Sequence, residues 1–301
     1  MSFIQSSKEE NSPYLQLLML IFYAVLSFIV SIVLAFLVLF GMYGMEIIRN
    51  PAILTVPNLQ YRPALQILLF AQSVGFFLIP PVLLAITEGK RISSFYGFKP
   101  PVLKLTGLVF LIIVLSTPLM EWMTVVNQQM KLPEFLKGVE DWMRRSEDSL
   151  METTLLLLKM STLKELGINL FLIALVAAVS EELMFRGAVQ RILTRIFKNP
   201  HVGIWVAAFI FSAIHMQFYG FLPRFILGAG FGYLYLWSGS LWYSILAHFL
   251  NNAFAVGQAY YLQKHNLSLD VENVTYFAWY GYVISFVLTI IAFQIFKKQS
   301  K

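Results

Sequence analysis

The sequence of 301 residues contains no cysteine. That absence excludes disulfides, thiolate nucleophiles and cysteine metal ligands. Charged residues are also scarce, at 13% of the chain, whereas 58% is hydrophobic. Because a soluble domain of this length needs a more charged surface, the predicted fold class is all-α, a polytopic integral membrane protein. The net charge of +6 is interpreted as basic loops beside membrane spans, and no nucleic-acid partner is expected.

Long apolar runs set the predicted architecture. A bilayer core of about 30 Å takes roughly 20 helical residues, and that length selects eight runs, which are approximately Tyr14–Met42, Pro63–Thr87, Val102–Val126, Gly167–Gln190, Val202–Tyr219, Arg224–Trp237, Leu241–Val256 and Tyr276–Phe296. Pro80 and Pro81 are expected to kink or break the second run. We therefore expect one helical membrane domain over residues 1–301, with about eight transmembrane helices around a polar intramembrane cavity.

Lysine and arginine predict the orientation. A cytoplasmic N-terminus keeps most short basic segments on the cytoplasmic side, namely Lys90, Arg91, Lys99, Lys104, Arg191, Arg195, Lys198, Lys297, Lys298 and Lys301. Both termini are thus predicted to be cytoplasmic. The long opposite connection, Asn127–Leu166, contains a stretch typical of an amphipathic helix at the interface. The tail shows no eukaryotic retrieval signal, which favours a bacterial inner membrane over the endoplasmic reticulum.

Few ionisable side chains fall inside the predicted spans. The acidic ones are Glu121, Glu181 and Glu182, and two of the four histidines, His215 and His248, lie in apolar runs. The three aspartates all fall in the connections: Asp141, Asp148 and Asp270. Because an ion at bilayer depth costs at least a few kcal/mol unless it is paired, these residues are candidates for a functional site. Glu121, beside a tryptophan at the end of its run, is interpreted as interfacial.

Helical spacing suggests partners for the two adjacent glutamates. Glu182 and Arg186 are four residues apart, so they share a helix face and can form an ion pair. Glu181 is rotated by about 100° from its neighbour and is free to point elsewhere. A buried ion pair can also be a purely structural contact between helices, so this pair alone does not define a site.

The other polar positions follow the same periodicity. Phe211 lies one turn before His215, and His248 shares a face with Asn252. A single buried histidine is more often a hydrogen-bonded core residue than a catalytic one. The combination of these residues in neighbouring spans, with almost no other intramembrane charge, favours a functional site. Gly228 and Gly232 have the spacing of a close helix–helix contact in lipid.

Three segments carry a resemblance to a known family. "EELMFR" from Glu181, "FSAIH" ending at His215 and "HFLNN" from His248 resemble the successive motifs of the CPBP (Abi) family of intramembrane peptidases, which includes the type II CAAX prenyl endopeptidases. The resemblance covers about Gly167 to Val256. It implies hydrolysis of a peptide bond in a membrane-associated protein or peptide, and whether that substrate is lipidated or prenylated stays open.

The resemblance also implies roles for the motif residues. Glu181, helped by His215, would activate a water molecule, while His248 and Asn252 would stabilise the oxyanion. Glu182, Arg186 and Phe211 would support the site. These roles need no cofactor.

Other functions remain open. Glu181, His215 and His248 are also a possible zinc ligand set, which would make the same protease metal-dependent. A proton-coupled transporter could use the glutamate and histidines as a relay, and a non-catalytic immunity or scaffold protein could retain the fold. The sequence does not fix the oligomeric state.

Overall fold

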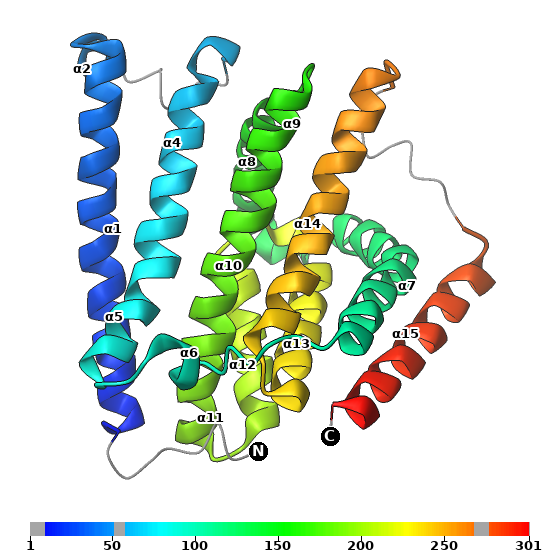
Figure 1. Ribbon diagram of the computed structural model, residues 1–301. Helices are drawn as coiled ribbons and strands as arrows, with labels where there is room; N and C mark the ends of the chain where they lie inside the picture. The colour runs from blue at the N-terminus through cyan, green and yellow to red at the C-terminus, as the bar shows by residue number, and fades with distance from the viewer. Residues whose placement is uncertain (1–9, 51–57, 268–276, 301) are drawn as a thin grey trace.

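The computed structural model describes residues 10–50, 58–267 and 277–300, and all regular structure in those ranges is helical (Figure 1). Within these ranges, five helices are long and apolar enough to cross a membrane by length and composition. The predicted class, an all-α polytopic membrane protein, is confirmed, whereas the count of eight spans is not. Asp270 and Tyr276, where the eighth predicted span begins, lie outside the described residues.

Those five helices form the frame of the bundle. They are α1 (Pro13–Tyr43), the continuous helix Leu59–Thr87, α7 (Leu103–Gln128), the continuous helix Leu163–Phe197 and α15 (Trp279–Gln299). The second comprises η1 (Leu59–Tyr61), α4 (Arg62–Gln72), η2 (Ser73–Leu78) and α5 (Ile79–Thr87). The fourth comprises α9 (Leu163–Asn169), η4 (Leu170–Val176), α10 (Ala177–Glu182), η5 (Leu183–Gln190) and α11 (Arg191–Phe197).

The prolines of the second long helix distort it without ending it. Pro80 and Pro81 lie in the first turn of α5, directly after η2, where the helix widens to π geometry over Ser73–Leu78. A proline lacks the backbone N–H that an interior helical position needs, so the preceding turn loosens to accommodate the missing bonds. The expected disruption is therefore present as a local widening, and the helix continues to Thr87.

A shorter hairpin replaces two of the predicted spans. Helix α12 (Pro200–Ala213) has 14 residues, or about 21 Å of rise, which is less than the roughly 30 Å hydrocarbon core. It is followed by η6 (Phe218–Gly220) and α13 (Phe221–Ser238). The turn between α12 and α13 therefore lies within the membrane thickness, and this turn contains His215. Helix α14 (Leu241–Lys264) extends beyond its predicted end and packs between this hairpin and the fourth long helix.

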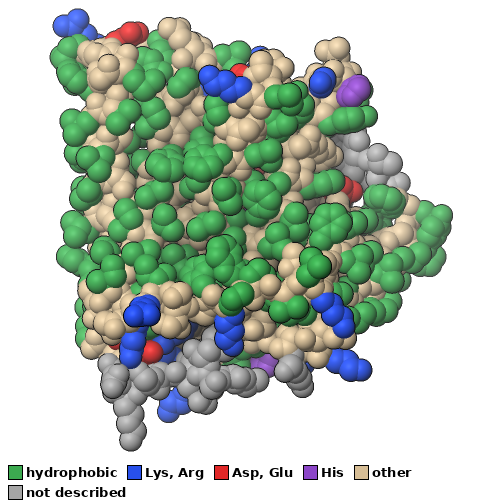
Figure 2. All heavy atoms as spheres, in the orientation of Figure 1, with side chains coloured by type: hydrophobic (Ala, Val, Ile, Leu, Met, Phe, Trp, Pro, Cys, Tyr) green, Lys and Arg blue, Asp and Glu red, His purple; other side chains and the backbone are tan. Residues whose placement is uncertain are grey.

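Many basic residues gather at one end of the bundle. The Lys104 Nζ donates to Gln299 Oε1 at 2.9 Å, the Ser240 hydroxyl donates to the Lys99 carbonyl at 2.7 Å, and Arg195 Nη2 donates to the Asn11 carbonyl at 2.8 Å. Figure 1 shows the start of α1, the short α6 (Ile92–Phe95), α11 and the end of α15 at this same end. In Figure 2 a broad hydrophobic band separates Lys and Arg side chains at the two ends. The grouping agrees with the predicted orientation, which the structure itself does not test.

The predicted amphipathic helix forms as α8 (Lys137–Leu158), after η3 (Glu134–Leu136). It carries Asp141 and Asp148, which are therefore helical and not in irregular loops. Within α8, Arg144 donates two hydrogen bonds to the Glu140 carboxylate, which together with a bond from the Leu132 backbone lowers the pKa of Glu140. The remaining short helix, α2 (Glu46–Arg49), follows α1.

Helix α8 covers the turn between α12 and α13. The rings of Trp142 and Phe218 have centroids 5.3 Å apart, and the guanidinium of Arg144 lies 4.6 Å from the centre of the Tyr219 ring. The Glu147 carboxylate accepts a hydrogen bond from the Tyr219 backbone N–H at 3.3 Å. These contacts fix the turn from its outer side.

Gly232 allows α13 to approach the fourth long helix. A Cβ atom at Gly232 would lie 2.7 Å from Gln190 Oε1 and 2.9 Å from a methyl carbon of Ile204. We expect Gly232→Ala to destabilise the protein by about 1–3 kcal/mol, because the overpacked atoms must shift. Thermal unfolding in lipid nanodiscs measures this effect. Gly107→Ala is the matched control, since a Cβ there meets no atom within 4 Å, and equal melting temperatures for both variants would contradict the prediction.

Candidate active site

The two adjacent glutamates lie on a regular helical segment between two widened ones. Helix α10 (Ala177–Glu182) is preceded by the π-helical η4 and followed by the π-helical η5. Such π segments inside a longer helix are frequent at functional sites, because they change the direction in which neighbouring side chains point. The fourth long helix is thus irregular on both sides of Glu181 and Glu182.

Glu182 and Arg186 form the predicted ion pair. Their Oε1 and Nη1 atoms are 2.6 Å apart, and the two side chains are 0% and 1% exposed. The other terminal nitrogen of Arg186 donates to the Gly228 carbonyl at 2.9 Å, and its guanidinium lies 4.6 Å from the centre of the Phe211 ring. One buried arginine therefore ties the fourth long helix to both arms of the short hairpin.

His248 also binds Glu182, a contact that the sequence did not predict. Its Nδ1 lies 2.8 Å from Glu182 Oε1, and its ring stacks on Phe231 at a centroid distance of 5.5 Å. Because an ionised carboxylate only accepts hydrogen bonds, Nδ1 is the donor and carries the proton. Glu182 consequently does more than pair with Arg186: it fixes the orientation of the His248 ring and directs Nε2 away from itself.

His215 is oriented by its own helix end. Its Nδ1 lies 2.7 Å from the Phe211 carbonyl oxygen, which can only accept, so Nδ1 is again the donor. The next residue, Met216, has φ of 55°, in the left-handed region that costs most side chains energy. The strained turn directly after α12 is what allows His215 to point back toward the bundle. In the neutral ring Nε2 is then free to accept a hydrogen bond.

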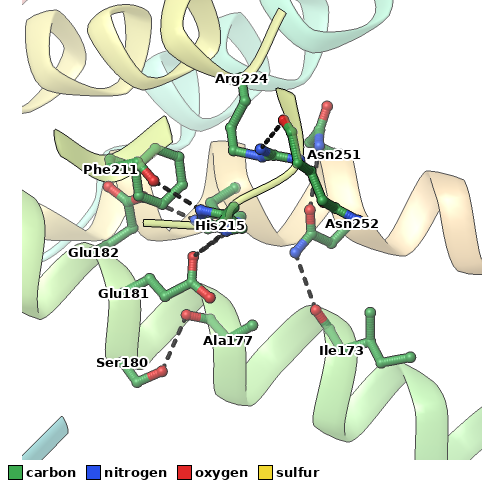
Figure 3. Close-up of polar contacts among 12 residues, drawn as sticks. Ile173, Ala177, Ser180, Glu181, Glu182, Phe211, His215, Arg224, Asn251 and Asn252 are labelled. Atoms are coloured by element: carbon green, nitrogen blue, oxygen red, sulfur yellow. Dashed lines mark hydrogen bonds and ion pairs between the residues drawn. The ribbon is translucent and has the colours of Figure 1, made fainter. Parts of the chain in front are cut away.

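Glu181 lies between the two histidines. Its Oε2 is 3.9 Å from His215 Nε2 and 3.9 Å from His248 Nε2, and its side chain is 13% exposed. Figure 3 shows Glu181 pointing at His215 and away from Glu182. A separation of 3.9 Å is too long for a direct hydrogen bond but short enough for one water molecule to bridge. The structure therefore brings together three of the four residues predicted to be catalytic, from the fourth long helix, the α12–α13 turn and α14.

The fourth residue, Asn252, lies one turn further along α14. Its Nδ2 donates to the Ile173 carbonyl at 3.0 Å, and its Oδ1 accepts from Asn251 at 3.2 Å (Figure 3). Among the described contacts it makes no hydrogen bond to Glu181 or to either histidine. Since a side-chain amide has two N–H groups, one of them remains for a ligand.

Arg224 and Glu121 are ionisable residues of the predicted spans outside the glutamate–histidine cluster. Arg224, at the start of α13, is close enough for its charge to act on Glu181 and His215, and the sequence signal that could have identified it is a lone arginine inside an apolar run. Glu121 instead lines a cavity of about 660 Å³ bordered by Leu250 and other apolar residues of α7 and α14. No described contact joins Glu121 to the glutamate–histidine cluster.

Glu181, His215 and His248 are also the predicted alternative zinc ligands. Glutamate and histidine are suitable ligand types for zinc, but the described residues contain no group of three or more His, Asp or Glu side chains arranged to hold a metal ion. Glu181 Oε2 lies 3.9 Å from the Nε2 atom of each histidine, a separation that suits a bridging water molecule. As the side chains are placed, they do not form a metal-binding group among the described residues.

The fold and the cluster define a class: an integral membrane protein with glutamate and histidine side chains that converge at bilayer depth. Residues 164–254, which include all of the cluster, match the family model described as type II CAAX prenyl endopeptidase Rce1-like. The predicted resemblance to the CAAX protease family is confirmed over this segment.

The chain is also similar to a curated protein. The chain is 30% identical over 89 residues to the uncharacterized protein YpbD of Bacillus subtilis (strain 168), an alignment that covers 28% of this chain and 42% of that protein. The chain thus matches less than half of the length of this relative. No solved structure matches the chain.

Proposed function

We propose that this protein is an intramembrane endopeptidase that hydrolyses a peptide bond in a membrane-associated protein or peptide. The observation that carries the proposal is the position of Glu181 Oε2, 3.9 Å from the Nε2 atoms of both His215 and His248, inside the segment that matches the CAAX protease family. We include lipidated and prenylated proteins among the proposed substrates, since the site lies at membrane depth. We also propose that the protein is located in a bacterial inner membrane, with both termini in the cytoplasm.

Glu181 and His215 activate the attacking water. Both Glu181 Oε2 and His215 Nε2 are acceptors, so a water placed between them donates one hydrogen to each and turns a lone pair toward the substrate. Glu181 takes the proton as the oxygen attacks the carbonyl carbon. When the C–N bond breaks, Glu181 returns that proton to the leaving amine.

His248 and Asn252 stabilise the negative oxygen of the tetrahedral intermediate. Nδ1 of His248 already donates to Glu182, so Nε2 donates only when the ring carries both protons. Asn252 contributes the N–H that is not bonded to Ile173.

The proposal requires no cofactor. In each proton transfer described above, Glu181 is one partner, and the other is the attacking water or the leaving amine. A zinc-dependent version of the same reaction is the alternative, and it differs in one testable respect, since its activity would depend on the metal.

A cleavage assay tests the proposed function. The purified protein is reconstituted in lipid vesicles with a library of fluorogenic peptides, with and without a lipid anchor, and products are identified by mass spectrometry. We expect cuts at internal peptide bonds, with a higher rate for the anchored peptides. Failure to cut any member of the library would refute the endopeptidase proposal and favour transport or scaffolding.

Asn252 is expected to matter less than the glutamate. Asn252→Ala should lower the cleavage rate by roughly 10²–10³-fold, the usual effect of losing one oxyanion donor, with little change in KM. Asn251→Ala is the matched control, because it removes only the bond to Asn252 Oδ1 and should slow cleavage by less than about threefold. Equal rate losses in the two variants would show that Asn252 acts by packing and not as a donor.

A further inference from the structure

Arg224 has no carboxylate partner in the described structure. It is a half-buried arginine in the first turn of α13, and its guanidinium donates to two neutral oxygens of one residue, Gln217: Oε1 at 2.6 Å and the backbone carbonyl at 3.5 Å. The ion pairs among the described residues include Arg186, Arg191 and Arg195 but not Arg224. Because a guanidinium has five N–H donors, three of them remain for a ligand.

The surroundings of Arg224 make a charged side chain there energetically unfavourable. The α12–α13 turn lies within the membrane thickness, where an unpaired charge is unfavourable and usually marks a functional site. The carboxylates whose charges act on Arg224 are Glu147 and Glu181, but neither forms an ion pair with it among the described residues. Glu147 instead accepts from the Tyr219 backbone. Arg224 therefore forms no structural ion pair among the described residues, in contrast to Arg186.

Arg224 also faces the candidate active site. Its charge acts on both Glu181 and His215, and Figure 3 shows its side chain extending from the turn toward the group formed by these residues. Gln217, which holds the guanidinium, is two residues from His215 in the same strained turn. The turn therefore positions the catalytic histidine and the arginine together.

We propose that Arg224 binds a carboxylate of the peptide substrate, within a few residues of the bond that is cut. This inference rests on the proposed endopeptidase function. The planar guanidinium forms paired hydrogen bonds with a carboxylate better than with any neutral group. An extended peptide covers about 3.3 Å per residue, so the carboxylate is either the chain terminus just beyond the scissile bond or a nearby acidic side chain.

Peptide binding tests the proposal without requiring turnover. Affinities are measured in lipid nanodiscs in a Glu181→Gln background, with four labelled peptides of one sequence: free C-terminal acid, C-terminal amide, and the amide with a glutamate or a glutamine beside the scissile bond. With Arg224 present, we expect one acidic peptide to bind about 10–100-fold more tightly than its neutral counterpart, as for a hydrogen-bonded charge pair. The identity of that peptide shows which carboxylate is bound.

Two variants give the controls. Arg224→Gln should reduce the acid-to-neutral affinity ratio to about one, and Arg224→Lys should restore part of it. Arg145→Gln, which removes an exposed arginine on α8, should leave the ratio unchanged. The proposal is overturned if neither acidic peptide is preferred, or if the preference survives in Arg224→Gln. Cleavage of the same peptides without any acid preference would overturn it too, while leaving the endopeptidase function intact.

Discussion

Replacing Glu181 with glutamine is expected to lower the rate of peptide cleavage by about 10²–10⁴-fold, an increase in the activation barrier of roughly 3–5 kcal/mol. Glutamine keeps the size of the side chain and its carbonyl oxygen, but it cannot take a proton from water. The two Nε2 atoms 3.9 Å away can still hold a water, so substrate binding should change little. The measurement is single-turnover cleavage of an anchored peptide in lipid vesicles.

Glu121→Gln is the matched control for this prediction. Glu121 is a glutamate of α7 outside the cluster, and it lines a separate cavity between α7 and α14. Its replacement should change the rate of cleavage by less than about threefold.

A sharper test combines Glu181→Gln with His215→Ala in one protein. Because both residues act on one water, the double variant should cleave within about threefold of the rate of Glu181→Gln alone. Full additivity of the two losses would contradict that shared role.

Replacing Arg186 with methionine is expected to destabilise the protein by about 3–5 kcal/mol. The change leaves the Glu182 carboxylate, which is 0% exposed, without its counter-charge, and an uncompensated buried ion is far less favourable than a buried pair. It also removes the hydrogen bond to the Gly228 carbonyl. Thermal unfolding in nanodiscs should therefore show a large drop in melting temperature.

A second substitution separates charge from packing. Glu182→Gln combined with Arg186→Met removes both charges, and we expect it to recover most of the lost stability, because replacing a whole buried pair is often close to neutral. Arg145→Met on α8 serves as the control and should have little effect, since Arg145 is exposed. If Arg186→Met alone melted at the wild-type temperature, the pair would not be the structural centre of the site.

Local periodicity predicted what lies within one helix. The spacing of Glu182 and Arg186 predicted their ion pair, and the rotation between adjacent residues predicted that Glu181 points elsewhere; both are confirmed. Hydropathy and length predicted an all-α membrane protein, but not that α12 is too short to cross. The difference arises because an apolar run gives the composition of a helix, whereas its ends depend on turns such as the one at Met216.

Contacts between helices were harder to predict. The bond from His248 to Glu182 joins residues 66 positions apart, and helical periodicity does not say which faces of distant helices meet. Arg191 was interpreted as a basic loop residue, yet it is buried, pairs with Glu10 at 2.5 Å and packs on Phe95. A positive charge near a membrane surface and one paired inside the bundle look alike in sequence. Arg224 was missed for a different reason: it begins a predicted span, and its position beside the cluster depends on the turn between α12 and α13.

The proposed mechanism is that Glu181, helped by His215, activates water without a metal ion. It is tested most directly by the cleavage rate of wild-type protein after exhaustive removal of metal, with residual zinc quantified by mass spectrometry on the same sample. We expect an unchanged single-turnover rate at less than about 0.05 zinc per chain. A rate that falls in proportion to the zinc removed, and returns when one equivalent is added back, would contradict it and assign Glu181, His215 and His248 as ligands.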